Sequence, residues 1–418
     1  MMNEEGNYLE VKLVEQHTYK PSSADFAELD RVCRLSKNLY NSTLYAARQG
    51  LFADGRFRRY HDINKDFTDT DQPDYRALPA KVSKLTQMLA DQSIASYLGL
   101  LKAYENGEIE NKPGLPRYLP KDGRQVLTYT EQAISTVRTG YVKLSGTSIY
   151  IPTNQENIRF VRVVPSRSNR NITIEIGYER ESEYKEGDKA AAIDLGVNNL
   201  AALVFTDRAP ILYNGKPLKS INQYYNKQLA ELKSRQDLSG SKRKTTNRIK
   251  QLHDKRNNKV KDYLHRVSRE ITTQLVASGV TTLVVGYNSG WKQDVNLGKI
   301  TNQKFVQIPF LMLLNMLRYK CALAGIRVVV TSEAYTSKCS FLDNEQVKKH
   351  EMYMGYRQKR GLYQSYSGGC INADINGGYN ILKLFYQQQE AWTAELHRDC
   401  VEVCSAPSVF TVNYKRVS

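Results

Sequence analysis

Two aspartates lie inside apolar stretches of this chain, far apart in the sequence. Asp194 stands near the end of the run 190–195, whose pattern predicts a buried strand, and Asp374 stands in 371–382, where a helix is predicted to begin. Burying a carboxylate among alanine and isoleucine is unfavourable unless the carboxylate has a partner. The two aspartates therefore predict a shared cation, and the fold must bring their segments together.

The segment between the two aspartates has a regular order of predicted elements. Strands are expected at 190–195, 200–205, 211–213, 281–286 and 326–331, with a helical pair over about 219–279, interrupted at 239–241, and a helix over 307–323. Three strands, a helical pair, a strand, a helix and a strand make up an α/β unit, and this order resembles that of an RNase H-type nuclease core. The pattern predicts a nuclease domain from residue 185 onward.

In a core of this kind, phosphodiester hydrolysis uses two metal ions held by several converging carboxylates. Mg²⁺ is the expected metal because it prefers oxygen ligands. Asp194 and Asp374 supply two carboxylates. The third usually follows the long helical insertion, in a pattern like Val-Val-Glu, but this chain reads Val284-Val-Gly286 and offers no side chain there.

Two interpretations of this gap are open. In the first the site is inactive and the protein only binds. In the second another carboxylate takes the role, and Glu333 is the first choice because it follows the neighbouring predicted strand, about 4.8 Å away in the sheet. Glu345 and Glu351 lie in a polar segment and are weaker candidates, and Glu333 as an ordinary solvated residue is the simplest alternative.

The first 180 residues have a different pattern. A strand over 7–15 precedes a helical block over about 23–106 and a connector rich in proline and glycine over 111–123. Short alternating strands follow to about residue 178, and their spacing predicts a small antiparallel β-barrel, which the first strand could complete.

Composition indicates a polyanionic partner. The 418-residue chain has a formal net charge of +17, and residues 219–270 hold fifteen Lys or Arg against five Asp or Glu, a bias that predicts contact with phosphates. No apolar run is long enough to cross a bilayer and no signal peptide is recognisable, so no membrane association and a cytoplasmic location are expected. The six cysteines fit free thiols in a reducing compartment better than disulfides.

At this point the chain resembles the TnpB family, transposon-encoded RNA-guided nucleases related to type V CRISPR effectors. The resemblance extends from about residue 7 to 385 and is carried by six motifs, of which those of the nuclease part are the most specific. The motifs are Leu35-Ser-Lys-Asn-Leu-Tyr-Asn41, Gly114-Leu-Pro-Arg-Tyr118, Ala192-Ile-Asp-Leu-Gly-Val-Asn-Asn-Leu200, Asn296-Leu-Gly298 with Asn302-Gln303, Tyr335-Thr-Ser-Lys-Cys-Ser340 and Asn372-Ala-Asp-Ile-Asn-Gly-Gly-Tyr-Asn-Ile381.

The resemblance implies an α/β multidomain fold: a RuvC nuclease domain of the RNase H-like class, a small wedge β-barrel and a helical recognition lobe. The implied segments are a wedge strand at 1–16, the lobe at 17–112, the wedge barrel at 113–184, RuvC at 185–335 and 371–386, a target-nucleic-acid-binding insert at 336–370 and a C-terminal tail at 387–418, expected to be loosely ordered.

The implied activity is guide-RNA-directed cleavage of target DNA beside a short flanking motif, with two Mg²⁺ ions on Asp194, Glu333 and Asp374, in a bacterial or archaeal cell. Guide RNA and target DNA are the expected partners, with one protein copy in the ribonucleoprotein. A cleavage-incompetent RNA-guided DNA-binding protein is the alternative. A DDE transposase shares the core, but its last acid is a glutamate on a helix, where this chain has an aspartate.

Five further residues are candidates for nucleic-acid contact: Trp291, Lys292, Tyr335, Arg357 and Arg360. Stacking on an aromatic side chain contributes about 1–3 kcal/mol per unpaired base, and the neighbouring cations would neutralise phosphates. For Trp291 a packing role in its loop is equally consistent with the sequence. For the basic residues of the insert, ordinary solvated charge is nearly as consistent.

The family insert commonly holds zinc on two Cys-x-x-Cys pairs. Here Leu342 replaces the partner of Cys339, Cys370 has no neighbouring cysteine and His350 is expected to be a surface residue. We therefore expect no structural zinc, with Cys400 and Cys404 as remote alternatives. The insert would instead fold by packing its aromatic residues Phe341, Tyr353, Tyr356 and Tyr363.

Overall fold

The computed structural model describes residues 8–138, 140–168, 170–240, 245–288 and 307–412. The chain divides into two compact units, one of residues 12–180 and one that combines the first eleven residues with 181–418. Each unit has a core of its own and is described by itself. None of the described helices is both long and apolar enough to span a membrane.

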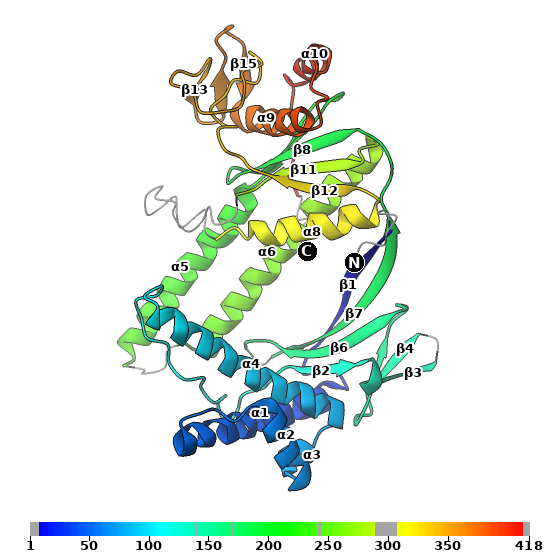
Figure 1. Cartoon of the computed structure of the whole chain (residues 1–418), viewed down its shortest axis with the longest axis vertical. Coiled ribbons are helices and arrows are strands. Elements are labelled where there is room, and N and C mark those ends of the chain that lie inside the picture. Colours follow the sequence, from blue (N-terminus) through cyan, green and yellow to red (C-terminus); the bar gives the residue numbers. More distant parts are fainter. Residues whose placement is uncertain (1–7, 139, 169, 241–244, 289–306, 413–418) are drawn as a thin grey trace. The chain divides into compact units, whose positions relative to one another are not determined.

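The unit of residues 12–180 packs helices against short strands (Figure 1). Its elements are β1 (Tyr8–Tyr19, which begins in the other unit), α1 (Phe26–Asp54), α2 (Tyr60–Asp69), α3 (Pro73–Arg76), α4 (Ala80–Glu105), β2 (Leu127–Thr130), a 3₁₀ turn (Glu131–Ala133), β3 (Ile134–Arg138), β4 (Tyr141–Leu144), β5 (Tyr150–Pro152), β6 (Ile158–Pro165) and β7 (Ile172–Glu183). One sheet has the order β1-β7-β6-β2 and a second the order β3-β4-β5. The short strands expected up to about residue 178 are therefore present, in two sheets, and the first strand of the chain belongs to one of them.

The other unit is built on a six-stranded mixed sheet of order β12-β11-β8-β9-β10-β16. Its strands are β8 (Ala190–Leu195), β9 (Asn199–Phe205), β10 (Ile211–Asn214), β11 (Thr282–Gly286), β12 (Arg327–Thr331) and β16 (Ser408–Phe410). Strands β8, β11 and β12 are parallel, and β9 is antiparallel to both β8 and β10. The predicted order of strands and helices from residue 190 to 331 is confirmed.

Helices cover both faces of this sheet. On one face lie α6 (Asn247–Ala277) and α8 (Phe310–Leu323), with α5 (Lys216–Leu238) beside α6; on the other lies α9 (Ala373–Gln388) (Figure 1). Successive side chains of a strand point to opposite faces. Ala191, Ile193 and Leu195 of β8 accordingly join the core beneath α6 and α8, while Ala190 and Ala192 join the core beneath α9.

The expectation of a loosely ordered C-terminal tail was wrong. Residues 394–403 form α10 (Ala394–Val403), and β16 pairs in parallel with β10. Thr393 begins α10 by accepting a hydrogen bond from the Leu396 amide at 3.1 Å, and Cys400 is fully buried against the α9 core. The sequence did not predict these two elements because both are short, have weak apolar periodicity and depend on tertiary partners.

Candidate metal centre

Asp194 reaches the α9 face of the sheet near the end of β8. It pairs with Ala202 of β9, and its side chain points to the same face as Ala190 and Ala192. Helix α9 approaches closely because it has glycine at this position: a Cβ built on Gly377 would lie 2.7 Å from Asp194 Oδ2. The helix therefore packs directly over the carboxylate, which keeps only part of its surface exposed.

Asp374 lies in the first turn of α9, where the positive end of the helix dipole favours a carboxylate. Asn372 caps this helix by accepting hydrogen bonds from the amides of Asp374 and Ile375 at 2.9 and 3.3 Å. Asn199 Nδ2 donates to Asp374 Oδ2 at 2.8 Å, and Arg357 Nη2 lies 3.6 Å from Asp374 Oδ1. The backbone cap and these two side chains fix the carboxylate.

Glu333 follows β12 and reaches the space that the glycine of the neighbouring strand leaves free. Gly286 of β11 pairs with Thr331 of β12, and a Cβ built on Gly286 would lie 2.9 Å from Glu333 Cγ. The Glu333 amide donates to Asn288 Oδ1 at 3.3 Å, and Thr336 Oγ1 donates to the Glu333 carbonyl oxygen at 2.9 Å. Glu333 Oε1 is buried, and no described residue donates a hydrogen bond to it.

The charges of Glu333 and Asp374 both act on the Asp194 carboxyl group, so the three acids lie near one another. Burial raises the pKa of Asp194 well above its usual value, and the charges of Glu333 and Asp374 raise it further, against the opposing effect of Arg357. Burial raises the pKa of Glu333 to about 7. Carboxylates placed together in this way are stabilised by a divalent cation, and the unpartnered Oε1 of Glu333 fits a metal ligand.

The other candidate carboxylates lie elsewhere. Glu345 is buried and accepts hydrogen bonds from the backbone amides of Ser340 and Met354, at 2.6 and 3.0 Å. Glu351 is exposed. Neither appears among the charges that act on Asp194.

The structure separates the candidate nucleic-acid contacts. Arg357 of β13 (Tyr356–Lys359) reaches the carboxylates through Asp374, whereas Arg360 lies exposed in the turn to β14 (Leu362–Gln364). Tyr335 follows Glu333 with a left-handed backbone (φ 65°) and a side chain that is 39% exposed. Trp291 and Lys292 lie outside the described residues.

The insert before α9 forms a three-stranded sheet, β13-β14-β15, with β15 at Cys370–Asn372. Phe341 and Tyr363 are buried, and Phe341 stacks on Tyr379 of α9 with ring centroids 4.5 Å apart. The expectation that Tyr356 packs inside the insert was wrong, since its side chain is 59% exposed on the outer strand.

The cysteines do not form the zinc arrangement that the family suggests. Cys339, Glu345 and His350 bring their ligand atoms within 4.8 Å of one another, but the two carboxylate oxygens of Glu345 already accept backbone hydrogen bonds. His350 Nε2 is hydrogen-bonded to the carbonyl oxygen of Gln346 at 2.7 Å. Cys370 is exposed, and Cys400 and Cys404 are buried in the α9 core. This polar cluster does not fit a structural zinc site, and the absence of zinc stays a prediction.

Sequence reasoning missed several residues that build the centre. Asn199 fixes Asp374, Asn288 holds the Glu333 backbone, and Gly377 lets α9 approach Asp194. Asn199 and Gly377 lie within motifs that the sequence analysis identified, so they could have been chosen as candidates. Their contacts with Asp374 and Asp194 could not be predicted from the sequence. Asn288 followed the predicted strand 281–286 with no pattern to distinguish it.

Comparison with known protein families gives two matches. A family described as a probable transposase, OrfB_IS605, matches residues 172–292, and a family described as the Cas12f1-like TNB domain matches residues 310–381. Together these segments include Asp194, Glu333 and Asp374.

Curated relatives and a solved structure agree with these families. The TnpB-like protein ORF457 of Acidianus two-tailed virus is 24% identical over 87% of this chain and 84% of its own length. The CRISPR-associated endodeoxyribonuclease Cas12f2 of a Micrarchaeota archaeon is 27% identical over 56% of this chain, which spans 44% of that relative. A Cas12f1 in complex with sgRNA and target DNA shares the fold, with a TM-score of 0.52 and 13% identity over 85% of this chain and 82% of that one.

Proposed function

We propose that this chain, which belongs to the TnpB family, is a guide-RNA-directed DNA endonuclease that hydrolyses target DNA beside a short flanking motif. The convergence of Asp194, Glu333 and Asp374 is the observation that carries the proposal. The relatives support it, because one is an endodeoxyribonuclease and the similar solved structure holds guide RNA and target DNA. Guide RNA and target DNA are thus the partners, and the host cytoplasm of a bacterium or archaeon is the proposed location.

The three carboxylates would hold two Mg²⁺ ions. Bound there, the metal would activate a water molecule and stabilise the negative charge of the leaving oxygen. Asp194 would hold metal together with the other two acids, since the charges of both raise its pKa. Glu333 brings a free buried oxygen, and Asp374 is oriented by Asn199.

Arg357 has a second role in this proposal. Its side chain is 53% exposed and its guanidinium lies beside Asp374, so it can leave that carboxylate and contact the phosphate of the strand to be cut. The insert that carries Arg357 would load this strand, with Arg360 and Tyr335 as contacts nearer its surface. The unit of residues 12–180 would provide the recognition lobe and the wedge barrel that read the flanking motif.

The alternative function is a guided DNA-binding protein without cleavage, and the observation that favours it is Gly286 in place of the usual glutamate. The position of Glu333 weakens this alternative, because its side chain fills the space over Gly286. A protein without catalytic activity would also not be expected to keep three carboxylates together in a partly buried site, because burying their charges is unfavourable.

A cleavage assay separates the two functions. The parent chain and Asp194→Asn are each loaded with guide RNA copurified from the host, and both binding and cutting of a matched target are measured with Mg²⁺. We expect equal binding, with cutting by the parent only. If both proteins bind the target and neither cuts it, the chain is a guided binding protein and the nuclease proposal is wrong.

A further inference from the structure

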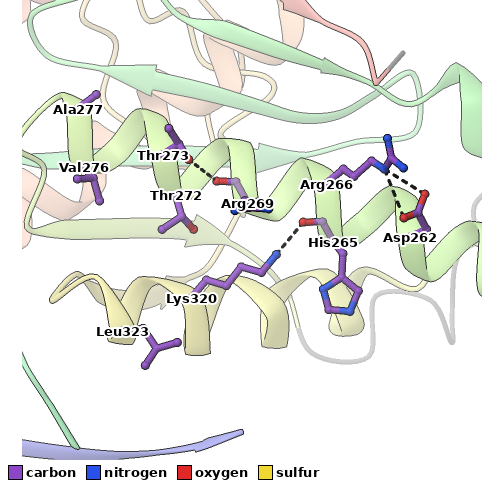
Figure 2. Close-up of a pocket in the computed structure, with 10 residues that line it drawn as sticks. All are labelled: Asp262, His265, Arg266, Arg269, Thr272, Thr273, Val276, Ala277, Lys320 and Leu323. Atoms are coloured by element: carbon purple, nitrogen blue, oxygen red, sulfur yellow. Dashed lines mark hydrogen bonds and ion pairs between the residues drawn. The ribbon is translucent and has the colours of Figure 1, made fainter. Parts of the chain in front are cut away.

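A groove with a volume of about 1060 Å³ runs between α6 and α8 of the nuclease unit. Figure 2 shows its walls: Lys320 projects from α8 toward α6, and the side chains of α6 follow one another along the other wall. The lining residues of α6 extend from Asp262 to Ala277, a length of about 22 Å at 1.5 Å per residue.

The groove has more positive than negative charge. Its one lining carboxylate, Asp262, is paired with Arg266 at 3.2 Å. Lys320 Nζ donates to the carbonyl oxygen of His265 and to Ser268 Oγ, both at 2.7 Å, and neither Lys320 nor Arg269 is ion-paired within the described ranges. Burial first, and the charge of Arg269 second, lower the pKa of Lys320 to about 8. An anion placed between these two cations would relieve their repulsion.

The groove lies across the sheet from the metal centre. Helices α6 and α8 pack on the face of β8 that carries Ala191 and Ile193, whereas Asp194 points to the α9 face. A polyanion in the groove is therefore held at a distance from the carboxylates and is not the strand being cut. Such a position suits a permanently bound nucleic acid better than a substrate.

One exposed hydroxyl group favours RNA as the occupant. Thr273 Oγ1 donates to the carbonyl oxygen of Arg269 at 3.1 Å, whereas Thr272 Oγ1 is also hydrogen-bonded to Cys321 Sγ at 3.9 Å and is not available. Because the Thr273 hydroxyl proton is directed to the helix backbone, its oxygen offers its lone pairs as acceptors. A ribose 2′-hydroxyl can donate to such an acceptor, and deoxyribose cannot.

We propose that the groove between α6 and α8 binds the sugar–phosphate backbone of the guide RNA, with Arg269 and Lys320 each contacting a phosphate. The inference rests on the proposed function, since it assigns a face of the protein to the guide. It also accounts for part of the basic excess of residues 219–270, which the metal centre does not use.

The test measures guide-RNA binding by the full chain over a series of salt concentrations, without target DNA. Arg269→Gln should weaken binding about tenfold and lower the slope of log K against log salt by about one, as expected for one lost phosphate contact. Arg235→Gln is the matched control: it removes the same charge from the same helical pair, but Arg235 lies outside the groove and is paired with Glu231 at 2.6 Å. The control should bind like the parent.

Other outcomes would overturn the inference. Equal guide-RNA affinity and equal salt slope for the parent and Arg269→Gln would show that the guide RNA does not bind in the groove. Target capture is measured separately on the guide-loaded proteins, and normal guide binding with weaker target capture would assign the groove to DNA. If Arg269→Gln loses guide binding and also has a lower melting temperature, Lys320→Gln is the second variant, and an unchanged salt slope in Lys320→Gln would overturn the inference. A parent complex that binds guide RNA but cuts no DNA contradicts the proposed nuclease and leaves this inference standing.

Discussion

The side chain of Glu333 lies over the backbone of Gly286, so that a Cβ built on the glycine would come within 2.9 Å of Glu333 Cγ. The two residues belong to neighbouring parallel strands, in which Gly286 is paired with Thr331, two residues before Glu333. A glutamate at 286 and the glutamate at 333 would therefore compete for one space. Strands β11 and β12 together therefore contribute one carboxylate, that of Glu333, near Asp194.

Replacing Glu333 with glutamine should abolish cutting and leave guide-dependent target binding unchanged, because the amide keeps the shape of the side chain and loses the charge that holds Mg²⁺. Cutting and binding are measured on the same guide-loaded preparations. The melting temperature of the parent should rise on addition of Mg²⁺ more than that of Glu333→Gln. Cutting at a rate near that of the parent would exclude Glu333 from the metal centre.

Replacing Gly286 with alanine should destabilise the fold by about 1–3 kcal/mol through overpacking and should also abolish cutting. The added methyl would lie 2.4 Å from Ile381 Cδ1 and would displace Glu333. Ile381→Val removes that Cδ1 atom, so the double variant should regain stability, measured by chemical denaturation, without regaining activity. Gly99→Ala is the control: it lies in α4 with open space around it and should gain up to about 1 kcal/mol.

The stability of the metal-free protein should fall as pH rises from about 4.5 to about 7. In this range the folded chain keeps the Glu333 proton, because burial raises its pKa to about 7, while the unfolded chain has lost it. The resulting decrease in the free energy of unfolding is roughly 3 kcal/mol at most. Denaturation in chelator at pH 5 and pH 8 measures this loss, which should be smaller in Glu333→Gln; the same loss in both proteins would contradict the prediction.

Lys383 joins α9 to the insert, and Lys383→Met should loosen the insert. The ammonium group is buried and donates to the carbonyl oxygens of Asn344 and Glu345 at 2.8 and 3.0 Å, so methionine would leave these acceptors without a donor. We expect a loss of roughly 2–3 kcal/mol and faster amide hydrogen exchange in residues 338–364. Lys359→Met, on an exposed position of β13, should behave like the parent.

The insert should fold without zinc. Metal analysis of the purified chain should find no stoichiometric zinc, and a zinc-selective chelator should leave the melting temperature unchanged at neutral pH. The reason is that Glu345 already joins the amides of Ser340 and Met354 across the position that a metal would occupy. One zinc per chain that disappears in Cys339→Ser would show that the cluster of Cys339, Glu345 and His350 binds metal.

The sequence determined the order of strands and helices from residue 190 to 331 and the placement of Asp194 and Asp374, because apolar periodicity and helix-start signals are local properties of the chain. It also suggested Glu333, since adjacent strands have a known spacing. Only the tertiary structure decided which face each side chain takes, that Gly377 admits the Asp194 carboxylate and that Asn199 orients Asp374. These relations depend on strand register and helix approach, and the short elements α10 and β16 depend on tertiary partners, which no local pattern encodes.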